Sequence, residues 1–150
     1  MSDMRDLYQE IIVDHSKKPR NFRFLSGASG HADGFNPLCG DKVSIFVKIE
    51  NDRVTDITFQ GSGCAISTAS ASLLTETLKG KTRAQVEALF QRFHELLTGD
   101  GKTPAPPELG KLAVFSGVAQ YPVRVKCATL AWHTLQAALA GSDNPVVSTE

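Results

Sequence analysis

Three cysteines are the residues of this sequence best suited to chemistry, and they stand far apart in the chain, at Cys39, Cys64 and Cys127. Their number is odd, so disulfide pairing would leave one thiol over. Reduced thiols that serve packing, metal binding or redox chemistry in a cytosolic protein fit better. Cys64 stands between a strand pattern that ends at Gly61 and a helix pattern rich in Ala, Ser and Leu. We expect the start of that helix to favour the thiolate of Cys64.

Hydrophobic alternation predicts a β-hairpin immediately before Cys64. Residues 43–49 and 54–59 alternate as half-buried strands, and residues 51–53 (Asn-Asp-Arg) form the turn between them. A three-residue turn places the apolar side chains of both strands on one face, whereas a two-residue turn would set them against polar residues. The favoured register opposes Glu50 with Val54, Ile49 with Thr55, Val47 with Ile57, and Ile45 with Phe59.

The same register brings chemically active residues together at the open end of the hairpin. Continued past the apolar pairs, it places Asp41 opposite Gly63 and Gly40 opposite Cys64. Directly opposed residues lie about 5 Å apart between Cα atoms. We therefore expect Cys39, Asp41 and Cys64 to meet at this end of the hairpin.

Cys127 belongs to the last predicted helix, which begins near Pro122 and stops at Gly141. Its apolar face must pack on the same sheet. Arg124 and Lys126 flank the cysteine, and two nearby cations again favour a thiolate. Three thiolates and one carboxylate would make four ligands, the tetrahedral count for zinc. The sequence holds no CxxC or HExxH pair, so the spacing by itself is a weak signal for a metal site.

Length and composition limit the classes of function. The chain has 150 residues, enough for one domain with a sizeable core, and we expect residues 1–150 to form a single domain. The 16 basic and 16 acidic residues cancel, so there is no strong field to hold nucleic acid or an anionic membrane. No apolar run approaches the roughly 18–20 residues that span a bilayer. The first residues contain no hydrophobic signal core, so we expect a cytoplasmic protein.

The patterns together predict an α+β fold, in which a small antiparallel sheet of about three strands is packed on one face by four to six helices. Residues 21–37 are expected to form a loop with one short strand near Phe35, and the tail from about residue 142 is expected to be frayed. The expected helices cover about residues 3–17, 65–78, 82–97, 109–119 and 122–141.

Three motifs, in order, resemble the NifU/IscU-like iron–sulfur assembly proteins, and most closely their SufU branch. They are residues 36–41 (NPLCGD), 61–72 (GSGCAISTASAS) and 124–132 (RVKCATLAW). The resemblance covers nearly the whole chain, including residues 7–15 (LYQEIIVDH). Residues 80–107 look like the insertion that marks SufU-type proteins. IscU-type proteins carry a histidine just before the third cysteine, where this chain has Lys126. The segment before Cys127 also departs from the chaperone-docking motif of IscU-type proteins.

The resemblance implies an IscU/NifU-like fold and a zinc-dependent sulfur acceptor that acts with a partner rather than as a stand-alone enzyme. Zinc would be held by the counterparts of Cys39, Asp41, Cys64 and Cys127, and Cys39 would accept the sulfur. The implied partners are a SufS-like cysteine desulfurase dependent on pyridoxal phosphate and downstream Suf-type assembly proteins. Arg124 would stabilise the thiolate or contact the partner, or is a plain surface arginine; Lys126 is a second auxiliary candidate.

Three alternatives stay open at the level of the sequence. The same ligands could carry a [2Fe–2S] cluster on a scaffold protein, an alternative against which residues 80–107 and Lys126 argue. A purely structural zinc site is the second alternative, although closed structural sites usually use four Cys or His ligands. The third is a cysteine hydrolase with Cys64 as nucleophile and His31 or His133 as base, for which no local motif exists.

Overall fold

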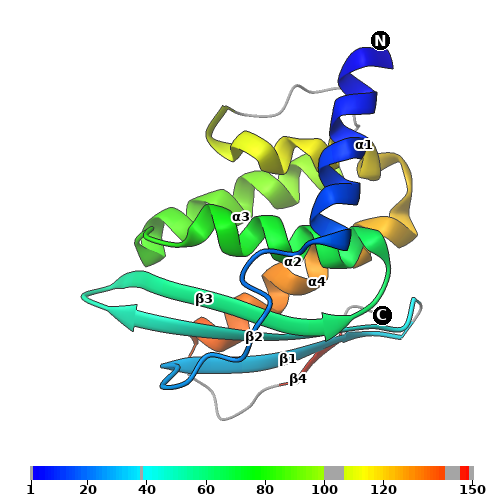
Figure 1. Ribbon diagram of the computed structural model, residues 1–150. Helices are drawn as coiled ribbons and strands as arrows, with labels where there is room; N and C mark the ends of the chain where they lie inside the picture. Colours follow the sequence, from blue (N-terminus) through cyan, green and yellow to red (C-terminus); the bar gives the residue numbers. More distant parts are fainter. Residues whose placement is uncertain (1, 38, 100–106, 141–145, 149–150) are drawn as a thin grey trace.

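The computed structural model describes residues 2–37, 39–99, 107–140 and 146–148 (Figure 1). It shows a four-stranded sheet in the order β3-β2-β1-β4, with the helices gathered on one face. In chain order the elements are α1 (Ser2–Lys17), β1 (Gly30–Asn36), β2 (Asp41–Glu50), β3 (Arg53–Ser62), α2 (Ala65–Leu78), α3 (Arg83–Thr98), the 3₁₀ segment η1 (Pro107–Gln120), α4 (Pro122–Leu139) and β4 (Val146–Ser148). The predicted α+β class is confirmed.

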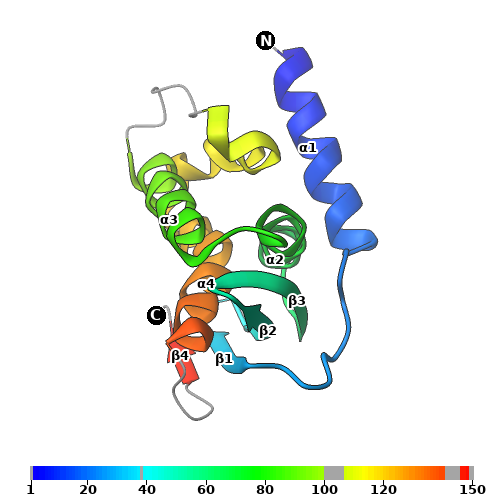
Figure 2. The same ribbon diagram turned by 90° about the vertical axis from the view of Figure 1, so that its left-hand side faces the viewer.

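The helices form two layers above the sheet. α4 packs on β1 and β2, and α2 packs beside it on β3. Figure 2 shows α1 on one side of α2 and α3 on the other side. The apolar faces of the central strands meet these helices. Aromatic stacking joins α3 to α4, where the rings of Phe93 and Trp132 lie with centroids 4.8 Å apart. The site-bearing helices α2 and α4 are therefore the inner layer.

Local sequence signals fix most of the helix ends. α2 covers the predicted residues 65–78, with Cys64 as its N-cap. α3 begins after Thr82, whose side chain and Gln85 form a reciprocal capping box. α4 begins at Pro122, a residue that is favoured in a first turn because it needs no hydrogen-bond acceptor there. The predicted short helix at 109–119 is instead a 3₁₀ segment interrupted at Gly110, where φ is +53°.

The turn between β2 and β3 corrects the predicted hairpin. Asn51 and Asp52 both have positive φ and form a two-residue turn, so Glu50 pairs with Arg53 and Ile49 with Val54. The predicted pairs of Glu50 with Val54 and of Ile49 with Thr55 are wrong. A turn with two left-handed residues matches the right-handed twist of the strands, which is why it is preferred.

A β-bulge then restores the register that the sequence predicts. The register shifts between Lys48 and Ile49, where Thr55 is the extra residue of β3, and beyond it Val47 pairs with Ile57 and Ile45 with Phe59, as predicted. The ladder ends with Lys42 opposite Ser62, so Asp41 and Gly63 follow at the site end. With the bulge at Thr55, a two-residue turn gives the same apolar pairs that the sequence pattern assigns to a three-residue turn.

Two strands were missed or underestimated. β1 has seven residues rather than a short strand near Phe35, because its glycines and polar residues pair with residues 41–47 of β2. Residues 146–148 pair in parallel with residues 33–35 of β1, so the prediction of a frayed tail is wrong for this segment. Residues 141–145 and 149–150 lie outside the described residues, as do residues 100–106 of the predicted insertion; its residues 83–98 form α3.

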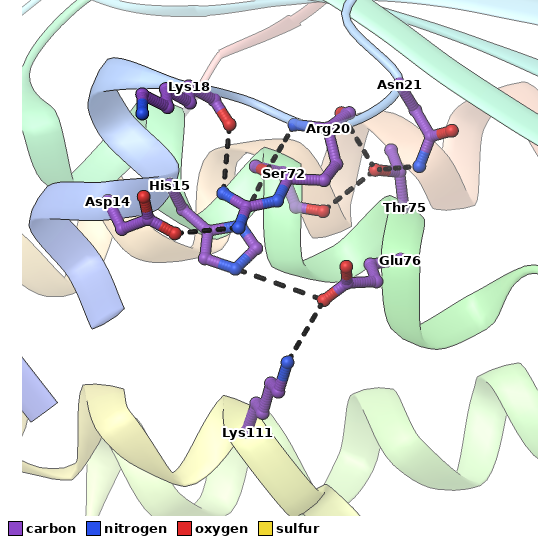
Figure 3. A network of polar contacts seen from close by, with 9 residues as sticks. All are labelled: Asp14, His15, Lys18, Arg20, Asn21, Ser72, Thr75, Glu76 and Lys111. Atoms are coloured by element: carbon purple, nitrogen blue, oxygen red, sulfur yellow. Dashed lines mark hydrogen bonds and ion pairs between the residues drawn. The ribbon is translucent and has the colours of Figure 1, made fainter.

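A polar network attaches α1 to the rest of the fold (Figure 3). His15 is buried, and its Nδ1 lies 2.7 Å from Ser72 Oγ in α2. The same hydroxyl accepts a hydrogen bond from the backbone N–H of Arg20. Glu76 lies between His15 and Lys111 of η1, at 3.9 and 3.8 Å. This network fixes the end of α1 and the following loop against α2.

Candidate metal centre

The predicted site residues come from four different elements. Cys39 lies in the short loop between β1 and β2, and Asp41 is the first residue of β2. Cys64 is the N-cap of α2, and Cys127 lies in the second turn of α4. Asp41 and Cys127 are completely buried, whereas Cys39 and Cys64 are partly exposed. The end of the hairpin and the starts of two inner helices therefore converge.

Cys39, Asp41 and Cys127 form a compact group. One potential ligand atom from each of them lies within 4.8 Å of the other two. The two sulfur atoms, Sγ of Cys39 and Sγ of Cys127, are 3.2 Å apart although 88 positions separate them in the sequence. Two thiols and one carboxylate at these distances form a donor set that a single metal ion can bind.

Cys64 lies beside this group and is joined to it through its backbone. Its N–H donates a hydrogen bond to Asp41 Oδ1 at 2.9 Å. Its Sγ accepts from the backbone N–H of Ser67 at 3.4 Å, which makes the thiol a helix cap. The charge of Cys64 raises the pKa of Arg124 and, in addition to the larger effect of burial, the pKa of Cys127. The predicted position of Cys64 between strand and helix is thus what the structure shows.

Gly63 permits the close approach of β3 to Asp41. A Cβ atom at this position would lie 2.5 Å from Asp41 Oδ1 and 3.1 Å from its Cα. Heavy atoms in van der Waals contact stand at about 3.5–4.0 Å, so a side chain here would push the carboxylate away. The glycine before Cys64 is therefore part of the construction of the site.

Asn36, the last residue of β1, also contacts the site, a role that the sequence does not predict. Its side chain is fully buried and donates from Nδ2 to Asp41 Oδ2 at 3.3 Å and to Cys127 Sγ at 3.6 Å. Its signals in the sequence are its place at the start of the 36–41 motif (NPLCGD) and a polar residue at a strand end, immediately before Pro37. A polar residue before a proline is common in turns, and neither signal gives the Asn36 side chain a role in the site.

The electrostatics at Cys127 differ from the prediction. Burial raises the pKa of the Cys127 thiol, and the neighbouring Cys39, Asp41 and Cys64 raise it further. The expectation that Arg124 and Lys126 make this group a thiolate is therefore wrong for the protein without metal, because loss of water outweighs cations nearer the surface.

The two flanking cations lie at the edge of the site. Arg124 is exposed, and its pKa is raised by the charge of Cys64 first, then by a hydrogen bond to Cys127 and by the charges of Cys127 and Cys39. Lys126 is half-buried next to Cys127 in α4. Arg124 thus faces the three thiols from the solvent side.

The donors fit a thiophilic cation. Asp41 is an ionisable group with no exposed surface, and the donors that contact it here are neutral, an amide of Asn36 and the backbone N–H of Cys64. A buried charge is stable only when it is paired or bound to a metal. Thiolates with a carboxylate suit Zn²⁺, and thiolates suit iron–sulfur clusters.

The hydrolase alternative lacks the geometry it needs. The ring of His31 stacks on Phe46 at 4.7 Å, and its Nε2 lies 3.0 Å from Asp33, at the end of β1 remote from Asn36. His133 packs edge-on against Phe90. Neither imidazole is placed as the base of Cys64.

Fold and site together define a small α+β protein with a cysteine–aspartate centre at one end of its sheet. No helix in the described part of the chain is long and apolar enough to cross a membrane. Residues 7–128 match the family described as the NifU-like N-terminal domain.

Named relatives and solved structures agree with this match. The chain is 41% identical over 144 residues to the "iron-sulfur cluster assembly scaffold protein IscU" of Streptococcus pyogenes serotype M1, covering 96% of this chain and 89% of that protein. It is 37% identical over 139 residues to the "zinc-dependent sulfurtransferase SufU" of Bacillus subtilis, covering 93% of each. A crystal structure titled as a putative scaffold protein for the SUF system, from Fervidobacterium islandicum, superposes with a TM-score of 0.81 at 35% identity, over 87% of this chain and 94% of that one. The chain belongs to the NifU-like N-terminal domain family.

Proposed function

We propose that this protein accepts sulfur, as a persulfide, from a cysteine desulfurase dependent on pyridoxal phosphate, and delivers it to Suf-type proteins during iron–sulfur cluster assembly. The observation that carries the proposal is the contrast in burial within the site. Cys39 is partly exposed on a loop, whereas Asp41 and Cys127 are completely buried. A sulfur donor on another protein can reach the first of these residues and not the other two. Reduced thiols of this kind fit a cytoplasmic protein.

We propose zinc as the cofactor of this site. Cys39, Asp41, Cys64 and Cys127 would hold it, which is the ligand count of a tetrahedral site. When bound, zinc would keep the thiols deprotonated at neutral pH, against the effect of burial on Cys127. The name of the Bacillus subtilis relative, a zinc-dependent sulfurtransferase, supports this choice of metal.

The transfer itself needs only the thiols and the donor. The Cys39 thiolate attacks the terminal sulfur of the desulfurase persulfide, and a new S–S bond forms on Cys39. The S–S bond of the donor breaks, and its cysteine leaves as a thiolate, so no external oxidant or reductant is consumed. Arg124 faces the thiols from the solvent side and would stabilise the negative charge during the exchange.

The proposal is tested with the cysteine desulfurase of the same organism and ³⁵S-cysteine. We expect the protein to increase alanine formation and to carry the label on Cys39, identified by alkylation and mass spectrometry. Cys39→Ser should abolish labelling, and Asp41→Ala should reduce both zinc content and activation of the desulfurase. Gln91→Ala, an exposed position on α3, is the matched control. Normal activation by the Cys39 and Asp41 variants would show that the proposed relay is wrong.

A scaffold that carries a [2Fe–2S] cluster is the second candidate. The relatives from Streptococcus pyogenes and Thermotoga maritima are named as assembly scaffolds, and the same thiols suit a cluster. Here the cluster would be the cargo. The absorption spectrum of the purified protein separates the candidates. A colourless protein with one equivalent of zinc supports the sulfur relay, and visible charge-transfer bands with bound iron support the scaffold.

A further inference from the structure

One side chain, the amide of Asn36, joins the two fully buried members of the site. Its Nδ2 donates to Asp41 Oδ2 at 3.3 Å and to Cys127 Sγ at 3.6 Å. A primary amide carries two N–H donors on one nitrogen, so both contacts can form at once. The group is itself completely buried, at 0% exposure. Its hydrogen bonds therefore do not compete with bulk water.

The position of Asn36 is fixed by its backbone, separately from the contacts of its side chain. It is the last residue of β1 and pairs with Asp41, the first residue of β2, in the antiparallel ladder. Its carbonyl also accepts a hydrogen bond from the backbone N–H of Cys39 at 3.3 Å. The sheet therefore holds the amide, and the amide in turn contacts two of the four proposed ligands.

Cys39 differs from these two ligands. Its backbone N–H donates to the Asn36 carbonyl, and its sulfur lies on a partly exposed loop, 3.2 Å from the sulfur of Cys127. The sulfur of Cys127 is therefore held by a buried N–H donor, whereas the position of the Cys39 sulfur is set by the loop that carries it.

We infer that Asn36 is a positioning residue for the zinc site proposed above: its amide N–H groups hold Asp41 and Cys127 as the fixed pair of ligands and leave Cys39 as the ligand that can depart. The inference rests on the proposed function. An N–H donor stabilises a thiolate as well as orienting it, and loss of such outer partners typically lowers metal affinity 10–100-fold.

The first test measures zinc affinity by chelator competition on the isolated protein. Asn36→Ala removes the side chain, and Asn36→Leu keeps its approximate volume while removing the donors, so the two variants separate the amide from the space it fills. Both should bind zinc about 10–100-fold more weakly than the wild type. Asn21→Ala, which removes a part-buried amide that bonds to Thr75, is the matched control and should bind as the wild type does.

A second readout responds to the N–H···S contact and not to general stability. With Co²⁺ in place of zinc, the near-ultraviolet thiolate-to-cobalt charge-transfer band should move to lower energy in Asn36→Leu, because the Cys127 sulfur loses its hydrogen bond. A variant that is only less stable, such as Asn21→Ala, should keep the wild-type band. An unshifted band together with wild-type zinc affinity in the Asn36 variants would overturn the inference.

The variant Asp41→Ala distinguishes a failure of this inference from a failure of the proposed function. If Asp41→Ala weakens zinc binding and the Asn36 variants do not, the site exists and Asn36 does not position it. If Asp41→Ala and Cys127→Ser also bind zinc as tightly as the wild type, the proposed zinc site itself is wrong.

Discussion

The backbone N–H of Cys64 donates a hydrogen bond to Asp41 Oδ1 at 2.9 Å, across the open end of the β2–β3 hairpin. The contact joins the start of one strand to the start of helix α2, so two elements that carry different site residues cannot move apart without breaking it. Gly63 lies against the same carboxylate.

Gly63→Ala should disturb the site more than it disturbs the fold. The added Cβ would lie 2.5 Å from Asp41 Oδ1, and we expect a loss of about 1–3 kcal/mol in the free energy of unfolding together with weaker zinc binding. Gly117→Ala is the control, because a Cβ there meets nothing within 4 Å. Chemical denaturation and zinc titration of both variants check the prediction, and equal behaviour of the two would contradict it.

Zinc should stabilise the folded protein. At a free zinc concentration about 100 times Kd, binding adds about 2.7 kcal/mol. In a domain of this size that corresponds to a rise of roughly 5–10 °C in Tm. Thermal unfolding with chelator and with added zinc measures the effect, and Mg²⁺, which prefers oxygen ligands, should produce no comparable rise. The rise should shrink in Cys39→Ser; a rise of full size there would remove Cys39 from the ligand set.

Arg124→Ala should slow sulfur transfer and leave the zinc content unchanged. The guanidinium is exposed and faces the thiols, so we expect a roughly two- to fivefold lower rate, the size of effect that an exposed charge produces. The difference from wild type should shrink at high salt. Arg92→Ala, an exposed arginine on α3, is the control. An unchanged rate in Arg124→Ala would show that the residue is a plain surface arginine.

The stability of the metal-free protein should fall as the pH drops below 6.5. Burial lowers the pKa of His15, and the charge of Arg20 lowers it further. Above pH 6.5 the imidazole is neutral in both states; below it the unfolded chain binds the proton first, so stability decreases until the folded state also protonates. Burial also lowers the pKa of His133, so its protonation changes the stability in the same direction as that of His15.

The contribution of His15 is isolated by comparing two proteins. Urea midpoints of the wild type and of His15→Asn, measured at pH 7.5 and 5.5, should show a smaller acid-induced loss in the variant, because His133 and the carboxylates contribute equally to both. The variant should also be less stable at pH 7.5, since the contact with Ser72 is lost. Equal acid-induced losses would mean that His15 is not the titrating group.

Periodicity and capping residues were enough to predict the helices α1 to α4 and the class of fold, but not the 3₁₀ form of η1. The bounds of α2 and the cap at Thr82 follow from local signals, because the residues that decide them are neighbours in the chain. A short strand near Phe35 was predicted, but the full length of β1 and the existence of β4 could not be predicted in this way. Their pairing depends on partners far away in sequence, and β1 is rich in residues that usually form loops.

The site was partly predictable for the same reason. The hairpin register placed Asp41 and Cys64 at one end, and that proximity is observed. The contribution of Asn36 depends on contacts with residues up to 91 positions away, which no pattern in the sequence reveals. The pKa of Cys127 also required the structure, because its burial is set by the packing of α4 on the sheet.

The bulge at Thr55 is the place where this hairpin can lose a residue without changing its register. Glu50 pairs with Arg53 and Ile49 with Val54 on one side of it, and Lys48 pairs with Asp56 on the other, so deleting Thr55 alone would leave a continuous ladder with the same partners. With the bulge retained, deleting one residue between Asp56 and Ser62 would instead move Cys64 past Asp41 by one position. A shortening of β3 should therefore be harmless at the bulge and damaging to the metal centre anywhere between the bulge and Cys64.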